Sequence, residues 1–290
     1  MKPIYQQPNG LIYQLDKNNF TAEVIYSPEA TGEILLPRSI KHESQEYILN
    51  CIGKNAFKNN NNIYSVDFEQ ESELQTICKN AFTNSSIQSI TIPSKVETIE
   101  DGWCRNLMLL HHIYLSPLNK NFKYLDENKS IIVGKTNPNN EIYDVIYFAI
   151  GKNTNITIPS TITEIRPYAF CNLHLSKLNF EKDSKLKRIG REAFTSNYLK
   201  NIEIPASVEV LEDGWIGERN NQLIVKIHPE NKFYKNLNDF MIVGKSNPKS
   251  DDFDVLVVAN YNISEVIIPS SIKIISSFAF NHCSNFSEVK

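Results

Sequence analysis

Two short stretches of the chain have the residue types of a phosphate-binding loop. Gly134-Lys135-Thr136 and Gly244-Lys245-Ser246 have the order of such a loop's last residues. The loop also needs a glycine five residues earlier, so that its backbone can wrap the phosphates, but Lys129 and Asp239 occupy those positions. In both stretches an Asn-Pro pair follows and disfavours the helix whose N-terminus would hold the anion. The pattern therefore favours a turn between two strands over a nucleotide site.

The histidines, cysteines and carboxylates form no recognisable catalytic or metal-binding pattern. The six histidines include no HExxH pair, and the five cysteines are widely spaced without a CxxC motif. We therefore predict buried free thiols. The acidic pair Glu100-Asp101 recurs as Glu212-Asp213, so neither pair is the unique constellation that catalysis needs. No enzyme activity, cofactor or metal is predicted.

Composition excludes several classes of partner. The 290 residues carry 30 basic and 33 acidic side chains, a formal net charge of −3, which lacks the basic excess of a nucleic-acid-binding protein. The longest apolar stretches, such as Val145–Gly151, are far shorter than the roughly 20 residues of a membrane span. The chain has 34 asparagines and only 10 glycines. Asparagine takes left-handed conformations, so many asparagine-stabilised turns are expected.

An internal repeat determines the predicted fold. Ala81–Gly102 aligns with Ala193–Gly214 without a gap, and Trp103 aligns with Trp215 in the same register; we call this the long repeat. We expect these tryptophans to fill the core, with ligand stacking as the less favoured alternative. Ala-Phe recurs five times, and an apolar residue before proline recurs five times. Chance does not produce such similarity.

Each repeat unit predicts one coil of a solenoid. Apolar residues in Ile87-x-x-Ile90-x-Ile92 alternate as in a half-buried strand, and proline then ends the strand because it lacks an N–H. A unit of this length cannot bury its apolar face alone, so units must stack. We predict a single solenoid over residues 1–290 with about nine coils. The coils are expected to begin near residues 31, 63, 87, 110, 153, 175, 199, 222 and 263.

The repeat pattern resembles that of a known family. L-x-x-I-x-I-P-x-x-V-x-x-I-x-x-x-A-F-x-x-C is similar to the BspA-like, or Treponema-type, leucine-rich repeat, and Ile87–Cys104 and Asn153–Cys171 follow it closely. This resemblance implies a parallel β-sheet on the concave side and short strands or helical turns on the other. It also implies a surface adhesin that binds extracellular-matrix proteins and host cells.

Three segments depart from the unit and predict β-hairpins. Residues 116–151 and 228–261 each place a turn sequence between two apolar runs, and residues 1–30 resemble the same device as a cap over the first coil. At the other end, Phe286–Val289 matches the opening of a further strand. An uncapped coil would leave an open strand edge, so we expect the chain to be truncated from a longer protein.

Polar and aromatic residues at the outward strand positions form the predicted binding surface. Aromatic side chains dominate interface energies, which makes the histidine and tyrosine residues near the fourth strand a candidate contact site. The alternative is that they are ordinary solvent-exposed side chains without a partner. The candidates on the concave face are Tyr64, Asp67, His111, His112, Tyr114, Asn155, Asn179, Glu203 and Lys226.

The sequence thus predicts a non-enzymatic, protein-binding repeat protein. By resemblance it is a cell-surface or secreted adhesin-like protein with a protein or glycoprotein partner and no nucleic acid. The alternative is an intracellular interaction scaffold of the same fold, because no signal peptide is visible in the first thirty residues.

Overall fold

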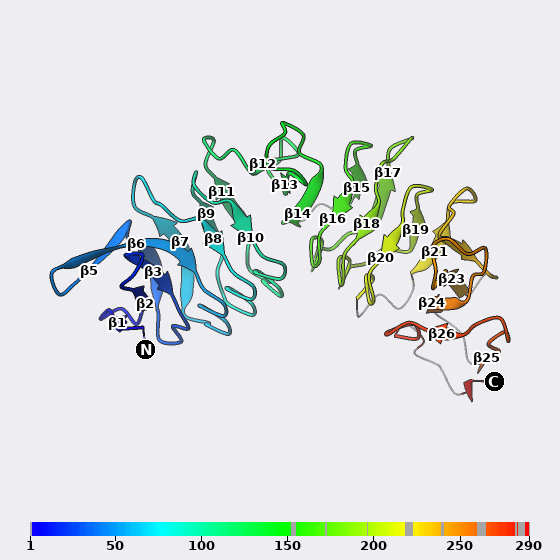
Figure 1. The fold of residues 1–290 in the computed structure, drawn as a ribbon, viewed down its shortest axis with the longest axis horizontal. Coiled ribbons are helices and arrows are strands. Elements are labelled where there is room, and N and C mark those ends of the chain that lie inside the picture. Colours follow the sequence, from blue (N-terminus) through cyan, green and yellow to red (C-terminus); the bar gives the residue numbers. More distant parts are fainter. Residues whose placement is uncertain are drawn as a thin grey trace. The chain divides into compact units, whose positions relative to one another are not determined.

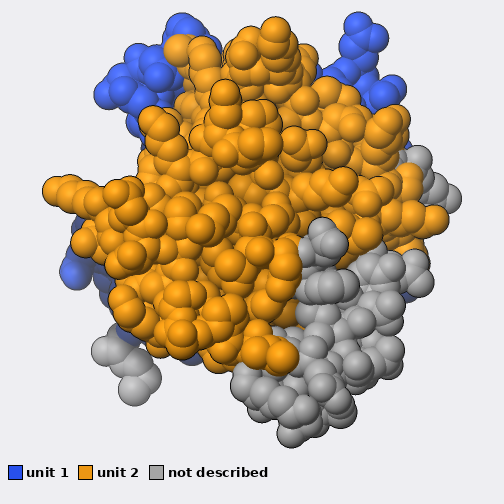
Figure 2. Space-filling view, turned by 90° about the vertical axis from the view of Figure 1, so that its right-hand side faces the viewer, with its two compact units in different colours: residues 1–141 blue, residues 142–290 orange. Residues whose placement is uncertain are grey.

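A computed structural model describes residues 2–151, 155–171, 173–195, 197–217, 223–238, 241–259, 265–281, 283 and 288–289. Within these residues the regular secondary structure consists of β-strands only (Figure 1). The chain forms two compact units, residues 1–141 and 142–290 (Figure 2).

Unit 1 contains a parallel sheet of strands four to six residues long, which we call the long-strand sheet. Buried and more exposed residues alternate along these strands because one face packs on the core, as in the strand Ser89–Ile92. The order is β11-β9-β7-β4. The strands are β4 (Gly32–Leu36), β7 (Ile63–Phe68), β9 (Ser89–Ile92) and β11 (His112–Leu115).

A second sheet of unit 1, the short-strand sheet, uses two-residue strands where the coils return. It continues into longer strands at the N-terminal end, where β2 and β3 form an antiparallel hairpin and β3 pairs in parallel with β6. The hairpin of β5 with β6 was not predicted. The strands are β1 (Ile4–Gln6), β2 (Ile12–Asp16), β3 (Thr21–Val24), β5 (Ser39–His42), β6 (Gln45–Ile52), β8 (Thr76–Ile77) and β10 (Thr98–Ile99). A further antiparallel pairing joins β12 (Lys123–Tyr124) to β13 (Ile131–Gly134).

Unit 2 repeats this arrangement. Its long strands pair in parallel as β15 with β17, β19 with β21 and β25 with β27. These strands are β15 (Asn155–Ile158), β17 (Lys177–Phe180), β19 (Asn201–Ile204), β21 (Ile224–Ile227), β25 (Glu265–Val266) and β27 (Glu288–Val289). Its short-strand sheet runs β14-β16-β18-β20. These strands are β14 (Val145–Ala149), β16 (Glu164–Ile165), β18 (Arg188–Ile189) and β20 (Val210–Leu211).

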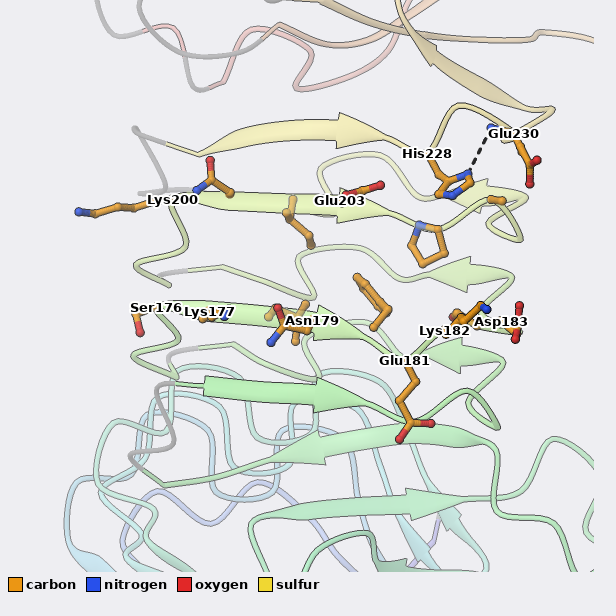
Figure 3. A pocket seen from close by; sticks show the side chains of 17 residues that line it. Ser176, Lys177, Asn179, Glu181, Lys182, Asp183, Lys200, Glu203, His228 and Glu230 are labelled. Carbon is orange, nitrogen blue, oxygen red and sulfur yellow. Dashed lines mark hydrogen bonds between the residues drawn. The ribbon is translucent and has the colours of Figure 1, made fainter.

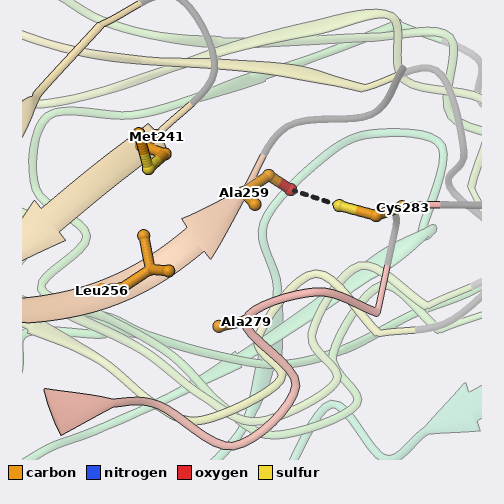
Figure 4. Packing of buried hydrophobic residues seen from close by; sticks show 5 residues of the cluster. All are labelled: Met241, Leu256, Ala259, Ala279 and Cys283. Atoms are coloured by element: carbon orange, nitrogen blue, oxygen red, sulfur yellow. Dashed lines mark hydrogen bonds between the residues drawn. The ribbon is translucent and has the colours of Figure 1, made fainter. Parts of the chain in front are cut away.

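The predicted hairpin segment of residues 228–261, which we call the second insert, is part of the sheets of unit 2. It forms the antiparallel strands β22 (Tyr234–Asn236), β23 (Met241–Gly244) and β24 (Val255–Ala259), and β24 then pairs in parallel with β26 (Ile274–Ile275). Met241 and Leu256 pack with Ala259, Ala279 and Cys283, so the hairpin is buried against the following coil (Figure 4). The last strand of the insert, β24, therefore serves as the first strand of the coil that continues with β26.

The predicted solenoid of parallel sheets is confirmed, and two-residue strands occupy the side for which short strands or helical turns were expected. Strands start within two residues of the predicted coil starts near 31, 63, 87, 110, 175 and 199. The predicted starts near 153, 222 and 263 lie outside the described residues, as do residues 284–287 of the predicted final strand.

The Ala-Phe pairs build a column of backbone bonds through each unit. In unit 1 the Phe57 N–H donates to the Ala81 carbonyl at 2.7 Å, and the Phe82 N–H donates to the Trp103 carbonyl at 2.8 Å. The rings follow the backbone, since the Phe57 and Phe82 centroids are 5.2 Å apart and stacked, and Trp103 meets Phe82 edge-on. Burial of one such ring contributes roughly 1.5–3 kcal/mol.

Unit 2 repeats the column with the aligned residues. Phe170 donates to Ala193 at 2.9 Å, and Phe194 donates to Trp215 at 3.2 Å. Trp215 lies edge-on to Phe194 and is 1% exposed, against 3% for Trp103. Both tryptophans therefore fill the core, and their backbones take the place of alanine.

Each Ala-Phe pair is preceded by a residue in the left-handed conformation. The alanine N–H closes a four-residue turn, as from Ala56 to the Gly53 carbonyl, and the positive φ of its third residue, Asn55, is that of a type II turn. Asparagine or glycine often occupies this position, but Tyr168, Glu192 and Phe278 also have φ between 51° and 67° there. The expected asparagine turns are thus present, while three coils hold a less suitable residue. The asparagines and glycines at this position are Asn55, Asn80, Gly102 and Gly214.

Buried asparagines join successive coils at a second place. Asn119 donates from Nδ2 to the carbonyls of Pro93 and Val96, and its Oδ1 accepts from two N–H groups of its own turn. Asn231, its counterpart in the register of the long repeat, has the same pattern with Pro205 and Val208. Both amides are buried, and these bonds satisfy them while tying the proline turn of one coil to the next segment of the chain.

Replacing Glu192 with asparagine should stabilise the protein. A left-handed conformation costs an L-residue about 1–2 kcal/mol, and asparagine tolerates it better. The substitution removes an ion pair with the largely exposed Arg191 and a long hydrogen bond, 3.4 Å, that the Tyr168 hydroxyl donates to Glu192, and both contribute little. We expect Glu192→Asn to raise the free energy of unfolding in urea by about 0.5–1 kcal/mol. Glu97→Asn, at an exposed position without positive φ, is the control and should change it by less than about 0.5 kcal/mol. A loss of stability in Glu192→Asn would contradict this explanation.

Candidate functional site

Strand register places the outward side chains of unit 1 in two columns. Leu35 pairs with Asp67 and Thr91 pairs with Tyr114, while Ser65 pairs with Ser89 and Ser89 with His112. Asp67 accepts a hydrogen bond from the Thr91 hydroxyl across the strands. The two columns form a continuous outward face on the long-strand sheet of unit 1.

An exposed cluster of rings lies at the end of this face, and we call it the aromatic patch: Tyr64, His111, His112 and Tyr114. The His112 and Tyr114 rings stack with centroids 5.9 Å apart, and His111 lies edge-on to His112 at 6.2 Å. Tyr114 is 56% exposed. Tyr64 sits at the same level two strands away, linked through Gln88, whose N–H donates to the Tyr64 carbonyl and whose carbonyl accepts from His111. The rings take no part in the core.

The candidates in unit 2 lie on the corresponding face but have a different character. Asn155 and Asn179 are joined by an amide hydrogen bond of 3.5 Å, and Glu203 pairs in register with Lys226. These side chains are polar or charged. The nine predicted residues thus fall into an aromatic group of unit 1, with Asp67 beside it, and a polar group of unit 2.

A groove of about 820 Å³ opens between β17 and β19 on the outward face of unit 2 (Figure 3). Asn179 and Glu203 line it, but the groove itself was not predicted. Lys177 and Lys200 lie toward the strand starts, and Glu181, Asp183 and Glu230 lie toward the strand ends (Figure 3). One sequence feature that could have indicated the groove is that Glu203 stands where the first copy of the long repeat has Thr91.

The second glycine-lysine stretch is a hairpin turn, as its sequence favoured. Ser246 donates to Asp254 from both its backbone N–H, at 2.9 Å, and its hydroxyl, at 2.8 Å. Asp254 is buried, and Lys273 lies 3.7 Å from its carboxylate. The hydrogen bonds from Ser246 hold the pKa of Asp254 below its ordinary value, and Lys273 adds to this effect. The serine hydroxyl that would bind a metal in a phosphate-binding loop is committed to this aspartate.

None of the five cysteines is in a disulfide. Cys104, Cys171 and Cys283 are buried, as predicted, whereas Cys51 and Cys78 are only partly buried. The sulfur atoms of Cys51 and Cys78 lie 3.6 Å apart on neighbouring coils. Burial raises the pKa of both thiols, which disfavours the nucleophilic thiolate. Among the described residues no group of histidine, cysteine or acidic side chains could hold a metal ion. A helix with the length and apolar character of a membrane span is likewise not found in that part of the chain.

Comparison with known proteins identifies the repeat. A sequence model described as "BspA type Leucine rich repeat region" matches six copies over residues 39–128, 118–236 and 255–290. The chain is similar in structure to a leucine-rich repeat protein from Eubacterium ventriosum, with 18% identity and a TM-score of 0.54, over 100% of this chain and 91% of that one. This likeness supports the solenoid fold. A search of curated proteins gives no match.

Two further structures resemble the chain more distantly. The pneumococcal vaccine antigen PcpA has 18% identity and a TM-score of 0.46, and the match covers all of this chain and 64% of PcpA. A leucine-rich cell-surface protein from Faecalibacterium prausnitzii has 15% identity and a TM-score of 0.41, with 100% and 76% of the two chains covered. The chain therefore spans less than two thirds of PcpA.

Replacing Asp254 with asparagine should cost stability in a pH-dependent way. Because folding lowers the pKa of Asp254, the carboxylate stabilises the fold fully above its unfolded pKa of about 4, and this contribution is lost as the pH falls through the folded pKa. We expect Asp254→Asn to unfold more easily than the parent at pH 7, and the difference to shrink on acidification below about pH 4. Urea unfolding across this pH range measures it. Asp252→Asn, at an exposed neighbour, is the control, and a difference independent of pH would contradict the role of the carboxylate.

Proposed function

Since the chain belongs to the BspA-type leucine-rich repeat family, we propose that it is a non-enzymatic cell-surface protein that binds a host or extracellular-matrix protein. The family's fold is generally one of protein interaction. Its stacked coils offer a continuous face whose outward side chains are free to vary without loss of the core. The surface location and the class of partner come from the family resemblance.

The aromatic patch is the observation that carries this proposal. Tyrosine and histidine rings combine contact area with polar atoms, and tyrosine is enriched at the centres of protein interfaces. Tyr64 and Tyr114 are each more than half exposed, so their rings are available to a partner. The flanking serine, threonine and aspartate side chains supply the polar rim that protein interfaces have.

Removing the rings should weaken binding without weakening the fold. We expect His112→Ala combined with Tyr114→Ala to lower affinity for a matrix protein about tenfold or more, because ring contacts dominate interface energies. The measurement uses immobilised fibronectin and fibrinogen, the matrix proteins associated with the family. Since both side chains are exposed, the melting temperature should stay unchanged.

The matched control alters the corresponding strand position in unit 2. Thr157→Ala changes the third residue of β15, the first long strand of that unit, just as Tyr114 is the third residue of β11, and Thr157 is exposed and is not among the predicted binding residues. This control should retain parent affinity. Unchanged binding by the His112/Tyr114 variant would remove the aromatic patch from the proposed site, and a failure of the parent to bind either matrix protein would reject that class of partner.

The location can be tested separately from the partner. We expect a membrane-impermeant, amine-reactive biotin reagent to label the protein on intact cells, because exposed lysines such as Lys177 and Lys226 lie on its face. A cytoplasmic protein of the same cells serves as the unlabelled control. Labelling only after lysis would favour the intracellular scaffold.

A further inference from the structure

The groove between β17 and β19 has a lining unlike that of a protein interface. Most of its lining residues are lysine, glutamate, aspartate, serine or alanine. These residue types are depleted in protein interfaces, whose centres are apolar and aromatic. Asn179 and Asn201 add amide groups that both donate and accept hydrogen bonds. Such a lining favours a ligand that is itself rich in hydrogen-bonding groups, as a saccharide is.

A ligand of this groove lies over the outward face and meets side chains, because the strand backbones are close together. The Tyr198 N–H donates to the Leu175 carbonyl at 2.8 Å and joins the two coils directly. On the other side of the same coils, β18 and β20 pair in parallel as neighbouring strands. The backbones therefore leave no room for another chain between them, and recognition depends on the outward side chains.

Two lysines give one end of the groove a positive charge. Lys177 and Lys200 lie where β17 and β19 begin (Figure 3). Within the described part of the chain, neither lysine forms an ion pair. In the register of the long repeat, the corresponding residues of unit 1 are the uncharged Ser65 and Gln88. The two ammonium groups of unit 2 therefore offer charge-assisted hydrogen bonds to an anionic group such as a carboxylate.

The opposite end of the groove determines the direction in which an anionic ligand lies. Glu181, Asp183 and Glu230 are found where the strands finish, with Lys182 among them (Figure 3). The three carboxylates outnumber this one lysine and repel a further negative charge. A carboxylate of the ligand is therefore favoured at the lysine end alone.

Between the two ends the groove offers polar groups and apolar ring surface. Asn179 donates to Asn155 at 3.5 Å, which orients its amide, and Glu203 is exposed. Phe180 and Pro205 are half-buried lining residues, so that part of each ring stays uncovered. Amide and carboxylate oxygens accept hydrogen bonds from hydroxyl groups, and apolar ring surface packs against C–H groups. A sugar ring presents both kinds of group.

A stacked pair of rings accompanies the lysine end. His174 and Tyr198 lie in the turns that lead into β17 and β19, each two residues before a lining residue, Ser176 or Lys200. Their ring centroids are 5.2 Å apart, and Tyr198 is 63% exposed. Ring surface of this kind allows a further sugar unit to pack beyond the groove.

We propose that this groove binds an oligosaccharide that carries a carboxylate. The carboxylate lies at Lys177 and Lys200, the hydroxyl groups bond to Asn179 and Glu203, and a sugar ring packs on Phe180. Sialic acids and uronic acids share this chemistry. A cavity of about 820 Å³ lies in the size range of ligand sites.

This inference goes beyond the proposed function, because the groove recognises a sugar and the aromatic patch recognises a protein. The two sites belong to different units and share no residue. A free sugar tests the groove without a matrix protein and without knowledge of where the protein is located. The two proposals can therefore fail independently.

NMR titration with free sugars tests the proposal directly. The probes are sialyllactose, which supplies a sialic acid, and a hyaluronan fragment, which supplies uronic acids. We expect at least one of them to shift the backbone amide resonances of Lys177, Asn179, Asn201 and Glu203. Methyl esterification of the carboxyl group of the bound sugar removes its charge and should weaken binding about tenfold or more.

Substitutions that give the groove the residues of unit 1 test the role of the lysines. Lys177→Ser combined with Lys200→Gln should reduce sugar affinity about tenfold or more. The fold should remain, because unit 1 holds these residues at the same positions of its coils. Lys41→Ser combined with Lys249→Gln removes two exposed lysines outside the groove and should retain parent affinity.

Three results would overturn the proposal: absence of binding by both sugars, undiminished binding of the methyl ester, or parent affinity in the Lys177/Lys200 variant. Enzymatic removal of glycans from a matrix glycoprotein separates sugar from protein recognition. If the Lys177/Lys200 variant still binds the deglycosylated glycoprotein more weakly than the parent does, the groove recognises protein and the proposal is wrong.

The variant of the aromatic patch separates this site from the proposed function. The His112/Tyr114 variant should bind the sugars as the parent does, since its changes lie in unit 1. Sugar binding without matrix-protein binding would reject the matrix-protein partner alone. Matrix-protein binding without sugar binding would reject the groove alone.

Discussion

Each coil of this protein depends on a backbone hydrogen bond to the next coil at the Ala-Phe turn. A parallel coil has no neighbour within its own segment to satisfy these groups, so the bond must pass to the adjacent repeat. The turn that presents the alanine carbonyl requires a left-handed residue immediately before it, as at Asn55, Asn80, Gly102 and Gly214. Phenylalanine follows the alanine because its ring stacks on the phenylalanine ring of the next coil. The Ala-Phe pattern therefore reflects the need to pair backbone groups between coils as well as the need to bury apolar side chains.

The same requirement accounts for the places where the repeat is interrupted. After Trp103 and Trp215 the chain leaves the Ala-Phe pattern. There the buried side-chain amides of Asn119 and Asn231 donate hydrogen bonds to the carbonyls of Pro93 and Pro205, in the proline turns of the preceding coil. In the second insert, Ala259 then donates to the Ala279 carbonyl and starts the column again. The antiparallel strands β22 to β24 therefore replace one coil without leaving its neighbours unpaired, which is why their apolar residues are buried.

Much of the fold could be predicted because several features of the repeat each indicate stacked coils. Ala-Phe, the proline after each long strand and the gapless long repeat each indicate stacked coils, and together they place the strands within two residues. The hairpin of β5 and β6 could not be predicted because it occurs once and its residues carry no repeated pattern. Outward positions such as Asp67, Asn179 and Glu203 were assigned by alternation, but alternation says nothing about whether neighbouring strands pair. The groove was missed for this reason, since it arises from the interaction of two coils.

Duplication gave the two units the same backbone and left their outward faces under weaker constraint. Inward residues such as Phe82 and Phe194 are the same in both copies because they stack in the same column. Outward residues have diverged, so that Asp67 and Thr91 hold two strands together in one copy, while Asn179 and Glu203 border an opening in the other. A scaffold in which buried positions fix the fold can change its contact chemistry at the outward positions, one pair at a time. Comparison of the two copies within one chain therefore separates the residues that build the coil from those that determine what it contacts.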